Sequence, residues 1–322
     1  MRIDDILKLL GDSWTGYKDL VRDTLRSNIE ALDVLNTSLM SNVGKQLRPV
    51  LSLLVSHACG GCNKDSLHFA AASEVLHNAT LFHDDVADGS ATRRGKPSLA
   101  SAVGPRAAVL VGDFWLSKAI SLILGTKHQN KAIPLFSVTL CNLAEGEMLQ
   151  LSKTSGATTT EEDYKRIIYC KTASLFESCC RAGALAMDAP ALQFEAAGSY
   201  GAALGMAFQI KDDILDYSGG ASVGKPLGED LAAGLVTLPL LGALRAFEDE
   251  SEVRSKVLEI KEHPESAASL RSFVLDNGGI EYAAEVLDSY ISEALDALSV
   301  FPDSPFKDAL VQIARYNAIR ES

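Results

Sequence analysis

Apolar residues recur at intervals of three and four positions along most of the chain. Near the N-terminus, Ile3, Ile6, Leu7 and Leu10 follow this spacing, and residues at such intervals share one face of an α-helix. No segment combines an alternating apolar and polar pattern with a hairpin turn, the combination that predicts paired strands. The pattern therefore predicts an all-α protein.

Several longer stretches continue the helical pattern. The stretch from Pro49 to Cys59 is almost wholly apolar, which predicts a buried helix. Later stretches are rich in Ala and Gly, whose small size lets neighbouring helices approach closely. The sequence from Thr160 to Asp163 places a carboxylate three residues after a Thr, which is typical of a helix start. The long helices that we predict are Pro49–Cys59, Ser66–Val86, Ala107–Leu124, Tyr164–Met187 and Leu192–Tyr217.

The chain has 322 residues, which by length alone would allow two domains. No Pro- or Ser-rich linker separates two apolar regions, however, and such linkers are typical of domain boundaries. We therefore predict one helical domain over residues 1–322, with a peripheral helical cap from about residue 245, where the chain becomes more charged.

Hydrophobic residues make up 47% of the chain and charged residues 22%, a composition that supports a large core. The formal net charge of −12 argues against nucleic acid as a partner, because such a partner needs a basic surface. The charge does not exclude an anionic substrate, since a few well-placed cations can dominate one cleft.

The six cysteines are scattered, and the CxxC pair of Cys59 and Cys62 lacks the second pair that a zinc site needs. The N-terminal sequence MRIDDILKLLGDSW is acidic and amphipathic, unlike a signal peptide. We also expect no apolar run of the length that crosses a membrane, about 20 residues. These features predict a cytoplasmic protein with no membrane anchor.

An acidic cluster stands at the end of the second long helix, in the sequence LFHDDVADGSATRRGKP. Asp84, Asp85 and Asp88 lie within about one helical turn of one another. Arg93 and Arg94 follow closely in the sequence. Carboxylates at this spacing suit Mg²⁺, which commonly shares its site with substrate phosphate, and arginines bind phosphate well. The cluster therefore predicts a site for a metal–diphosphate complex, although a solvated helix end would show similar charges.

A second cluster repeats this spacing, with Asp212, Asp213 and Asp216 in the sequence FQIKDDILDY. Two facing helices with matched triplets could hold several Mg²⁺ ions around one diphosphate. A calcium-binding EF-hand is excluded because its loop pattern is missing. A di-iron bundle would need a second Glu-x-x-His pair beside Glu74 and His77, and none is present.

Basic and polar residues elsewhere could complete such a site. Lys45 and Arg48 stand at the start of a predicted helix, where the helix dipole favours anions. Solvated cations at a helix flank are an equally good interpretation of this pair. Further individual candidates are His77, Lys171, Thr172, Gln209 and Lys225.

Taken together, these motifs resemble the trans-type polyprenyl diphosphate synthases. The resemblance covers about residues 44–239 and follows the order GKQLRP, EVLHNATLFHDDVAD, RRGKPS, VLVGDF, KTASLF, FQIKDDILD and VGKPLGEDL. It implies a helical bundle around a deep central cavity, in which an allylic diphosphate ionises, isopentenyl diphosphate attacks the carbocation, and a proton is lost. It also implies a homodimer that associates through the region 103–124.

The resemblance assigns a role to each candidate. Asp84, Asp85, Asp88, Asp212 and Asp216 would hold three Mg²⁺ ions on the allylic diphosphate, with Asp213 as an outer member of that set. Arg93, Lys171 and Lys225 would contact the allylic diphosphate itself. Lys45, Arg48, His77 and Arg94 would bind the diphosphate of isopentenyl diphosphate, and Thr172 and Gln209 would line the reaction centre.

One position departs from the family pattern. The family usually carries a Lys in a GKxTLP segment, and this chain has Leu235 there. The loss of one cation leaves open a non-catalytic partner subunit of a heteromeric synthase. A class I terpene cyclase is a further alternative, disfavoured because cyclases usually carry Asn, Ser and Glu in the second metal motif.

In the family that these motifs resemble, product length depends on the residues about one turn before the first aspartate, here Asp84. Ala79 and Thr80 are expected to face the floor of the cavity, where a bulky aromatic residue would stop chain growth. Because Ala79 is small, we predict a geranylgeranyl or longer product, and an Ala79→Phe change is expected to shorten it. Trp115 or Phe136 could still form a deeper floor.

Overall fold

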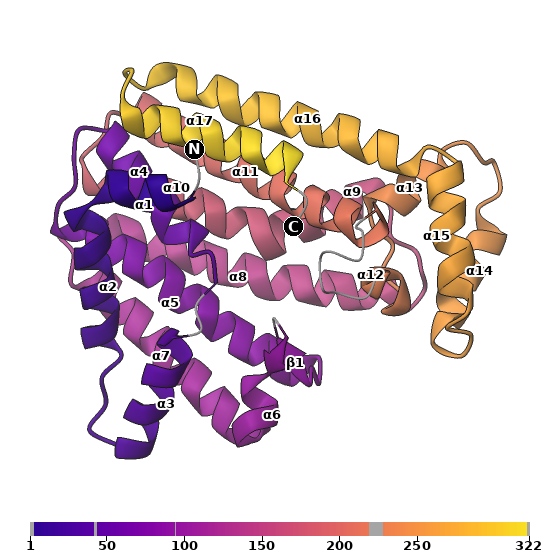
Figure 1. Ribbon diagram of the computed structural model, residues 1–322, viewed down its shortest axis with the longest axis horizontal. Helices are drawn as coiled ribbons and strands as arrows, with labels where there is room; N and C mark the ends of the chain where they lie inside the picture. The colour runs from indigo at the N-terminus through magenta and orange to yellow at the C-terminus, as the bar shows by residue number, and fades with distance from the viewer. Residues whose placement is uncertain (1–2, 42–43, 94, 219–227, 321–322) are drawn as a thin grey trace. The chain divides into compact units, whose positions relative to one another are not determined.

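The computed structural model describes residues 3–41, 44–93, 95–218 and 228–320, and it is built almost wholly of helices (Figure 1). The predicted all-α fold is confirmed. The α-helices are α1 (Ile3–Leu10), α2 (Asp12–Thr24), α3 (Glu30–Ser41), α4 (Leu47–Ala58), α5 (Lys64–Ala87), α6 (Leu99–Val103), α7 (Pro105–Leu124), α8 (Gln129–Thr154), α9 (Glu161–Ile168), α10 (Ser174–Ala186), α11 (Ala191–Ser218), α12 (Glu229–Ala232), α13 (Leu238–Leu244), α14 (Ser251–Leu258), α15 (Ser266–Asp276), α16 (Gly279–Ala297) and α17 (Pro305–Ile319). The shorter elements are the π-helix η1 (Tyr169–Ala173), the 3-10 helices η3 (Glu259–Lys261) and η4 (Leu298–Val300), and the strands β1 (Thr92–Arg93) and β2 (Lys96–Pro97).

Two helices begin with reciprocal side-chain caps. Before α9, the side chain of Thr160 accepts from the backbone N–H of Asp163, and the carboxylate of Asp163 accepts from the backbone N–H of Thr160. Asn63 and Ser66 form the same arrangement at the start of α5. Each pair satisfies backbone donors that the first helical turn leaves unpaired, so the helix start predicted at Thr160 is confirmed.

Two details differ from the sequence-based prediction. The segment Tyr164–Met187 was expected to be one helix, but the π-helix η1 interrupts it and divides it into α9 and α10. The second detail is a two-residue hairpin in which Thr92 pairs with Pro97 and Arg93 with Lys96. Strands this short carry too few residues to show an alternating pattern.

The chain divides into two compact units, each described here by itself. Unit 1 comprises Met1–Ser137, Ser178–Ala197 and Val300–Leu310. Within it α7 packs along α5, and α5 also packs on α2 and α4. Helix α4 is almost wholly buried, as its apolar sequence predicts.

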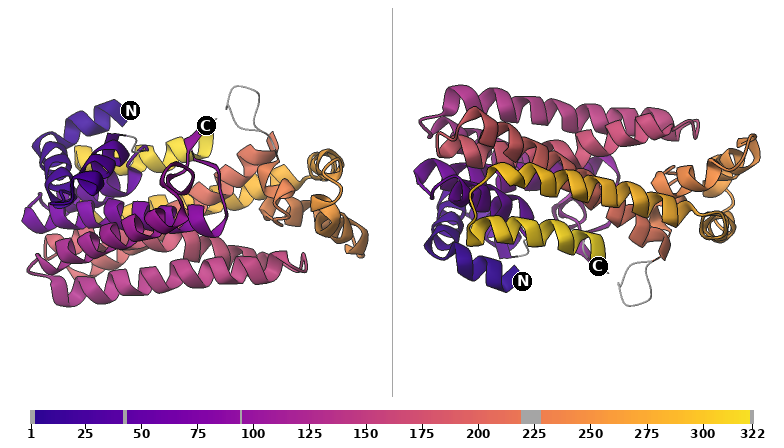
Figure 2. Two further views of the ribbon diagram at one scale, coloured as in Figure 1. Left: turned by 90° about the horizontal axis from the view of Figure 1, so that it is seen from below. Right: turned by 90° about the horizontal axis from the view of Figure 1, so that it is seen from above.

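Unit 2 comprises Val138–Glu177, Gly198–Ser299 and Val311–Ser322. Helix α13 packs against α15 and α16, and α14 lies against α15 (Figure 2). Buried residues of α15 and α16, such as Val274 and Leu287, share one core with α11 residues such as Ile210. The helices after residue 245 thus take part in a core, while the single domain over residues 1–322 stays a prediction.

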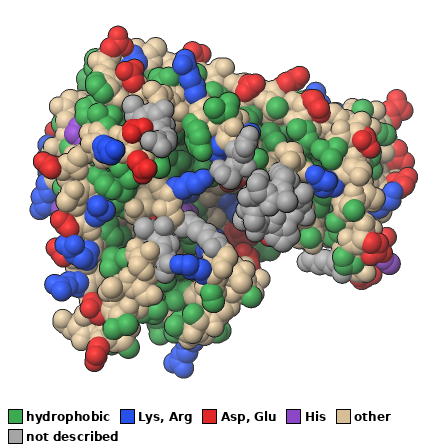
Figure 3. Space-filling model, in the orientation of Figure 1, with side chains coloured by type: hydrophobic (Ala, Val, Ile, Leu, Met, Phe, Trp, Pro, Cys, Tyr) green, Lys and Arg blue, Asp and Glu red, His purple; other side chains and the backbone are tan. Residues whose placement is uncertain are grey.

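Helix α7 also corrects the expectation about membrane-length segments. Pro105–Leu124 is long and apolar enough to cross a membrane by length and composition. The same test is met by core helices, and α7 packs along α5 in the structure. On the face that Figure 3 shows, acidic and basic side chains are interspersed among apolar ones.

Candidate active site

The first aspartate triplet lies at the C-terminal end of α5, in unit 1. Asp84 and Asp85 belong to the last turn, and Asp88 caps the helix by donating its backbone N–H to the carbonyl of Asp84 at 2.8 Å. The three side chains differ in exposure, because Asp85 is only 1% exposed whereas Asp84 is half-buried and Asp88 is exposed. Only the first and third carboxylates therefore reach solvent.

The buried Asp85 is paired with Arg93 of strand β1. The guanidinium Nε of Arg93 donates to Oδ1 of Asp85 at 2.6 Å. A guanidinium carries four more N–H groups on its terminal nitrogens, so Arg93 can be positioned by Asp85 and still bind phosphate. Arg94, its predicted neighbour in the site, lies outside the described residues.

A close contact between α5 and α7 supports this triplet. His83 lies within 3.3 Å of both the carbonyl of Val109 and the carboxylate of Asp113. A Cβ at Gly112 would come within 2.3 Å of the His83 ring, so a glycine is needed there for the ring to keep its place. The sequence analysis missed this role, although the motif VLVGDF contains the glycine.

The residues predicted to set product length also lie in unit 1. Ala79 is fully buried, and Thr80 is half-buried with its hydroxyl donating to the carbonyl of His77 at 2.9 Å. Trp115 is buried, packs edge-to-face on Phe82 with ring centroids 5.2 Å apart, and donates its indole N–H to Asn36 at 2.8 Å. Phe136 is buried against Phe69.

The second triplet lies near the C-terminal end of α11, in unit 2, and, as in the first, its second carboxylate is the buried one. Asp213 is 3% exposed, whereas Asp212 and Asp216 are half-buried. The Asp213 carboxylate accepts from the Tyr164 hydroxyl at 2.6 Å and from the Gln209 amide at 2.9 Å. Burial, followed by the negative charge of Asp230, raises the pKa of Asp213 well above its usual range.

The two flanking carboxylates of this triplet have other partners. Asp212 accepts from the buried Arg320 of the C-terminal segment at 2.5 Å. Asp216 accepts from the backbone N–H groups of Glu229 and Asp230, each at 3.1 Å, at the start of α12. The second triplet is therefore tied to two segments that follow it in the sequence.

Lys171 and Thr172 lie on the π-helix η1, also in unit 2. The ammonium of Lys171 pairs with Glu147 at 2.5 Å and donates to Gln150 at 3.0 Å, both on α8. The Thr172 hydroxyl donates to the side-chain oxygen of Gln209 at 2.9 Å. π-helical turns occur frequently at functional sites, which adds weight to both residues.

Two glycines let neighbouring helices approach this π-helix. A Cβ at Gly146 of α8 would come within 2.7 Å of Cys170, and one at Gly205 of α11 would come within 2.5 Å of the Ala173 backbone. Both contacts are shorter than a real Cβ tolerates, so these positions require glycine.

The remaining predicted residues have the following positions. Lys45 is exposed just before α4, Arg48 is half-buried in its first turn, and His77 is half-buried on α5. Leu235 is half-buried and donates its backbone N–H to the carbonyl of Asp230 at 2.9 Å. Lys225 lies outside the described residues.

The donor chemistry of the triplets fits Mg²⁺. Among the described residues, no three His, Cys, Asp or Glu side chains already form a metal cage. The carboxylates that reach solvent are those of Asp84 and Asp88 in the first triplet and of Asp212 and Asp216 in the second. Mg²⁺ usually takes one or two carboxylates and completes its shell with water and substrate phosphate, so an incomplete set of hard oxygen donors is what such a site requires.

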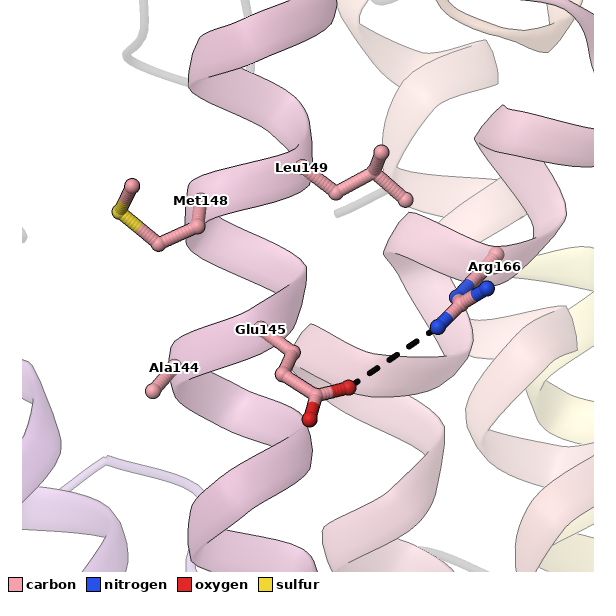
Figure 4. Close-up of a pocket in the computed structure, with 5 residues that line it drawn as sticks. All are labelled: Ala144, Glu145, Met148, Leu149 and Arg166. Carbon is pink, nitrogen blue, oxygen red and sulfur yellow. Dashed lines mark ion pairs between the residues drawn. The ribbon is translucent and has the colours of Figure 1, made fainter.

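Hollows on the surface of the two units add little to this picture. The hollow between α8 and α9 in unit 2 has a volume of about 500 Å³. It is lined mainly by apolar atoms and by Glu145 and Arg166, 3.9 Å apart, and contains none of the predicted site residues (Figure 4). A smaller hollow of about 290 Å³ in unit 1 includes Asp85 and Gly89. The residues themselves, rather than these hollows, define the candidate site.

Comparison with known proteins agrees with this geometry. Residues 29–274 match the polyprenyl synthetase family. The chain is 33% identical over 326 residues to octaprenyl diphosphate synthase of Escherichia coli, with all of both chains covered. It is also 34% identical over 331 residues to a short-chain isoprenyl diphosphate synthase of Methanothermobacter thermautotrophicus, covering 100% of this chain and 99% of the relative.

A solved structure shows the same fold. The polyprenyl synthase from Caulobacter crescentus, complexed with calcium and isoprenyl diphosphate, superimposes with a TM-score of 0.90 at 32% identity and covers 100% of this chain and 98% of its own. The resemblance inferred from the aspartate motifs is thus confirmed. The chain belongs to the polyprenyl synthetase family of prenyltransferases.

Proposed function

We propose that this protein condenses an allylic prenyl diphosphate with isopentenyl diphosphate in a Mg²⁺-dependent reaction. The observation that carries the proposal is the pair of aspartate triplets, each at a helix end, with a buried second carboxylate and a solvent-reaching first one. Family membership supports the same reaction class.

The residues of the site would divide the work. Asp84, Asp88 and Asp212 would hold three Mg²⁺ ions on the allylic diphosphate, and the other aspartates of the triplets would complete the acidic surface. When bound, Mg²⁺ neutralises charge on the leaving diphosphate. Further cations would fix the two substrates, and they are Lys45, Arg48, His77, Arg93, Arg94, Lys171 and Lys225.

We propose a medium-to-long all-trans product, geranylgeranyl or longer. The octaprenyl name of one relative supports this length, while the short-chain name of another shows that similarity alone leaves length open. The test incubates purified protein with Mg²⁺, labelled isopentenyl diphosphate and each allylic primer, followed by chromatography of the chains. Farnesyl diphosphate as the main product at saturating isopentenyl diphosphate would contradict the proposal.

Thr80 offers a better probe of product length than Ala79. Ala79 is fully buried, so a Phe there overfills a packed position, whereas Thr80 is half-buried. Thr80→Phe is expected to shift the product to shorter chains without loss of folding. Thr37→Phe is the matched control, because Thr37 is an exposed helical Thr with the same kind of bond to a backbone carbonyl.

A non-catalytic partner subunit is the second candidate function, and Leu235 is the observation that favours it. Leu235→Lys separates the two: a large gain of turnover from an inactive wild type would support the partner role. An active wild type would exclude it.

We also propose a cytoplasmic homodimer without a membrane anchor. Apolar side chains on α7, including Leu110 and Leu124, are more than half exposed in the single chain, as a subunit contact would require. All six cysteines lie within the described residues and none forms a disulfide, as in a reducing compartment. Light scattering of the purified protein measures the oligomeric state.

A further inference from the structure

Four side chains of unit 2 form one continuous hydrogen-bonded chain. Tyr164 of α9 donates to Oδ2 of Asp213 at 2.6 Å, and the Gln209 amide donates to Oδ1 of Asp213 at 2.9 Å. The Thr172 hydroxyl, on the π-helix, donates to Oε1 of Gln209 at 2.9 Å. The chain therefore connects a fully buried phenol to a residue proposed to line the reaction centre.

Chemistry fixes the direction of this chain. Oδ1 of Asp213 is an acceptor both when the carboxyl is ionised and when Oδ2 carries a proton, so the Gln209 amide turns its NH₂ group toward it. The Gln209 oxygen must then face Thr172 and accept the hydroxyl proton. Because a hydroxyl has a single proton, the Thr172 oxygen can only accept toward a substrate.

The surroundings of Asp213 agree with a positioning role. Both of its oxygens are engaged, and its side chain is buried, unlike those of Asp212 and Asp216 on the same helix.

We infer that Tyr164 and Asp213 are positioning residues that, through Gln209, fix the Thr172 hydroxyl as an acceptor at the reaction centre, and that Asp213 does not bind Mg²⁺. This inference rests on the proposed prenyltransferase function. The competing interpretation is that the same bonds only hold α9 against α11. A purely structural network would be indifferent to the direction in which Thr172 donates.

Reversal of the chain separates these interpretations. Asp213→Asn keeps the shape of the side chain but replaces one acceptor oxygen by an NH₂ donor. With the Asn oxygen accepting from the Tyr164 hydroxyl, this NH₂ group faces Gln209, so the Gln209 amide turns over and donates to Thr172. The doubly substituted D213N/Q209E protein keeps the net charge and restores an acceptor opposite Thr172. We expect D213N to lower kcat by about tenfold, with KM within about twofold, and the added Gln209→Glu change to recover about half of the loss on a logarithmic scale.

Tyr164→Phe is expected to lower kcat by about two- to fivefold, since one of two donors to Asp213 remains. Tyr282→Phe is the matched control, because it removes another phenol–carboxylate bond, to Glu161, that is not part of the chain. It should leave kcat unchanged. The inference is overturned if D213N retains wild-type kcat, or if Gln209→Glu fails to rescue it while both proteins melt at the same temperature.

A binding measurement keeps the inference testable without turnover. Mg²⁺ is titrated calorimetrically into the protein with inorganic diphosphate present. We expect D213N to bind Mg²⁺ as tightly as the wild type and Asp212→Asn to bind it at least tenfold more weakly. Equal weakening in both variants would show that Asp213 is a ligand. Failure of the proposed function appears differently, as absence of product from the wild type with every primer.

Discussion

The two aspartate triplets share their spacing and a buried second carboxylate, yet different chemistry surrounds that carboxylate in each. In unit 1, Asp85 pairs with the cation Arg93. In unit 2, Asp213 is held by two neutral donors, Tyr164 and Gln209. An ion pair compensates a buried carboxylate by charge. The hydrogen bonds from the neutral donors Tyr164 and Gln209 lower the pKa of Asp213 by less than burial raises it, so that pKa stays above its usual range.

A repeated aspartate motif can therefore carry two kinds of buried second carboxylate. The bond from Asp85 positions a phosphate-binding candidate, Arg93, whereas the bonds to Asp213 position Gln209 and Thr172. We propose that the solvent-reaching aspartates are the members of the two triplets with a common role. Variants of a solvent-reaching aspartate and of a buried aspartate therefore test whether the two kinds differ in role.

The largest loss of kcat is expected at the solvent-reaching aspartates. Asp84→Asn or Asp212→Asn removes a charged ligand from the leaving diphosphate, and kcat should fall by about 10³-fold. The Mg²⁺ concentration for half-maximal activity should rise in the same variants. Asp288→Asn, at an exposed aspartate on α16, is the control. If kcat falls by less than tenfold in Asp84→Asn or in Asp212→Asn, the proposed common role is contradicted.

Substitution of glycines at two helix contacts should differ in cost: Gly205 lies beside the π-helix η1 in unit 2, and Gly112 lies beside the first triplet in unit 1. At Gly205 an added methyl group meets the backbone of Ala173, which cannot rotate away. We expect Gly205→Ala to destabilise the fold by about 1–3 kcal/mol. At Gly112 the obstacle is the tip of the His83 side chain, which can rotate, so Gly112→Ala should cost less than about 1 kcal/mol. Urea denaturation of both variants measures the difference, and equal costs would contradict this distinction.

The sequence predicted local features well because they depend on neighbouring residues. The capping pair at Thr160 and Asp163 and the two aspartate triplets are each contained within a few positions. The π-helix η1 was missed because no residue in YCKTA disfavours an ordinary α-helix. Its conformation instead accompanies close approach of α8 and α11 at Gly146 and Gly205.

Partners distant in sequence were also missed. Tyr164 is an ordinary apolar position in the helical pattern, and only the fold places it on Asp213, 49 residues later. Arg320 lies far beyond the segment that carries the family resemblance, and its contact with Asp212 spans 108 residues. Contacts of this kind depend on tertiary structure and leave no periodic trace in the sequence.

A smaller effect is expected from Arg320, which anchors the C-terminal segment on the second triplet. Its guanidinium donates to Asp212, to the carbonyl of Phe208 and to Asn317. Arg320→Met keeps much of the buried volume but removes these bonds, and should lower the free energy of unfolding by about 1–2 kcal/mol. Arg254→Met is the control. Arg254 is a half-buried arginine of unit 2 that pairs with Glu250, away from the second triplet. An unchanged melting temperature of Arg320→Met would show that these bonds do not stabilise the fold.

The smallest effect concerns the pH dependence of stability without Mg²⁺. Burial raises the pKa of Asp213 in the folded protein. In the unfolded chain the pKa of an aspartate is about 3.9. Between these two values the folded protein keeps the carboxyl proton and the unfolded chain has lost it. The carboxyl therefore stabilises the fold fully below about pH 4, and this contribution declines as the pH rises toward the raised value. Asp213→Asn removes the titration, so its stability relative to the wild type should increase with pH, by at most about 1.4 kcal/mol per pH unit. Urea midpoints of both proteins at pH 5 and pH 6, with chelator present, measure this slope. A parallel pH dependence of the two proteins would contradict the raised pKa of Asp213.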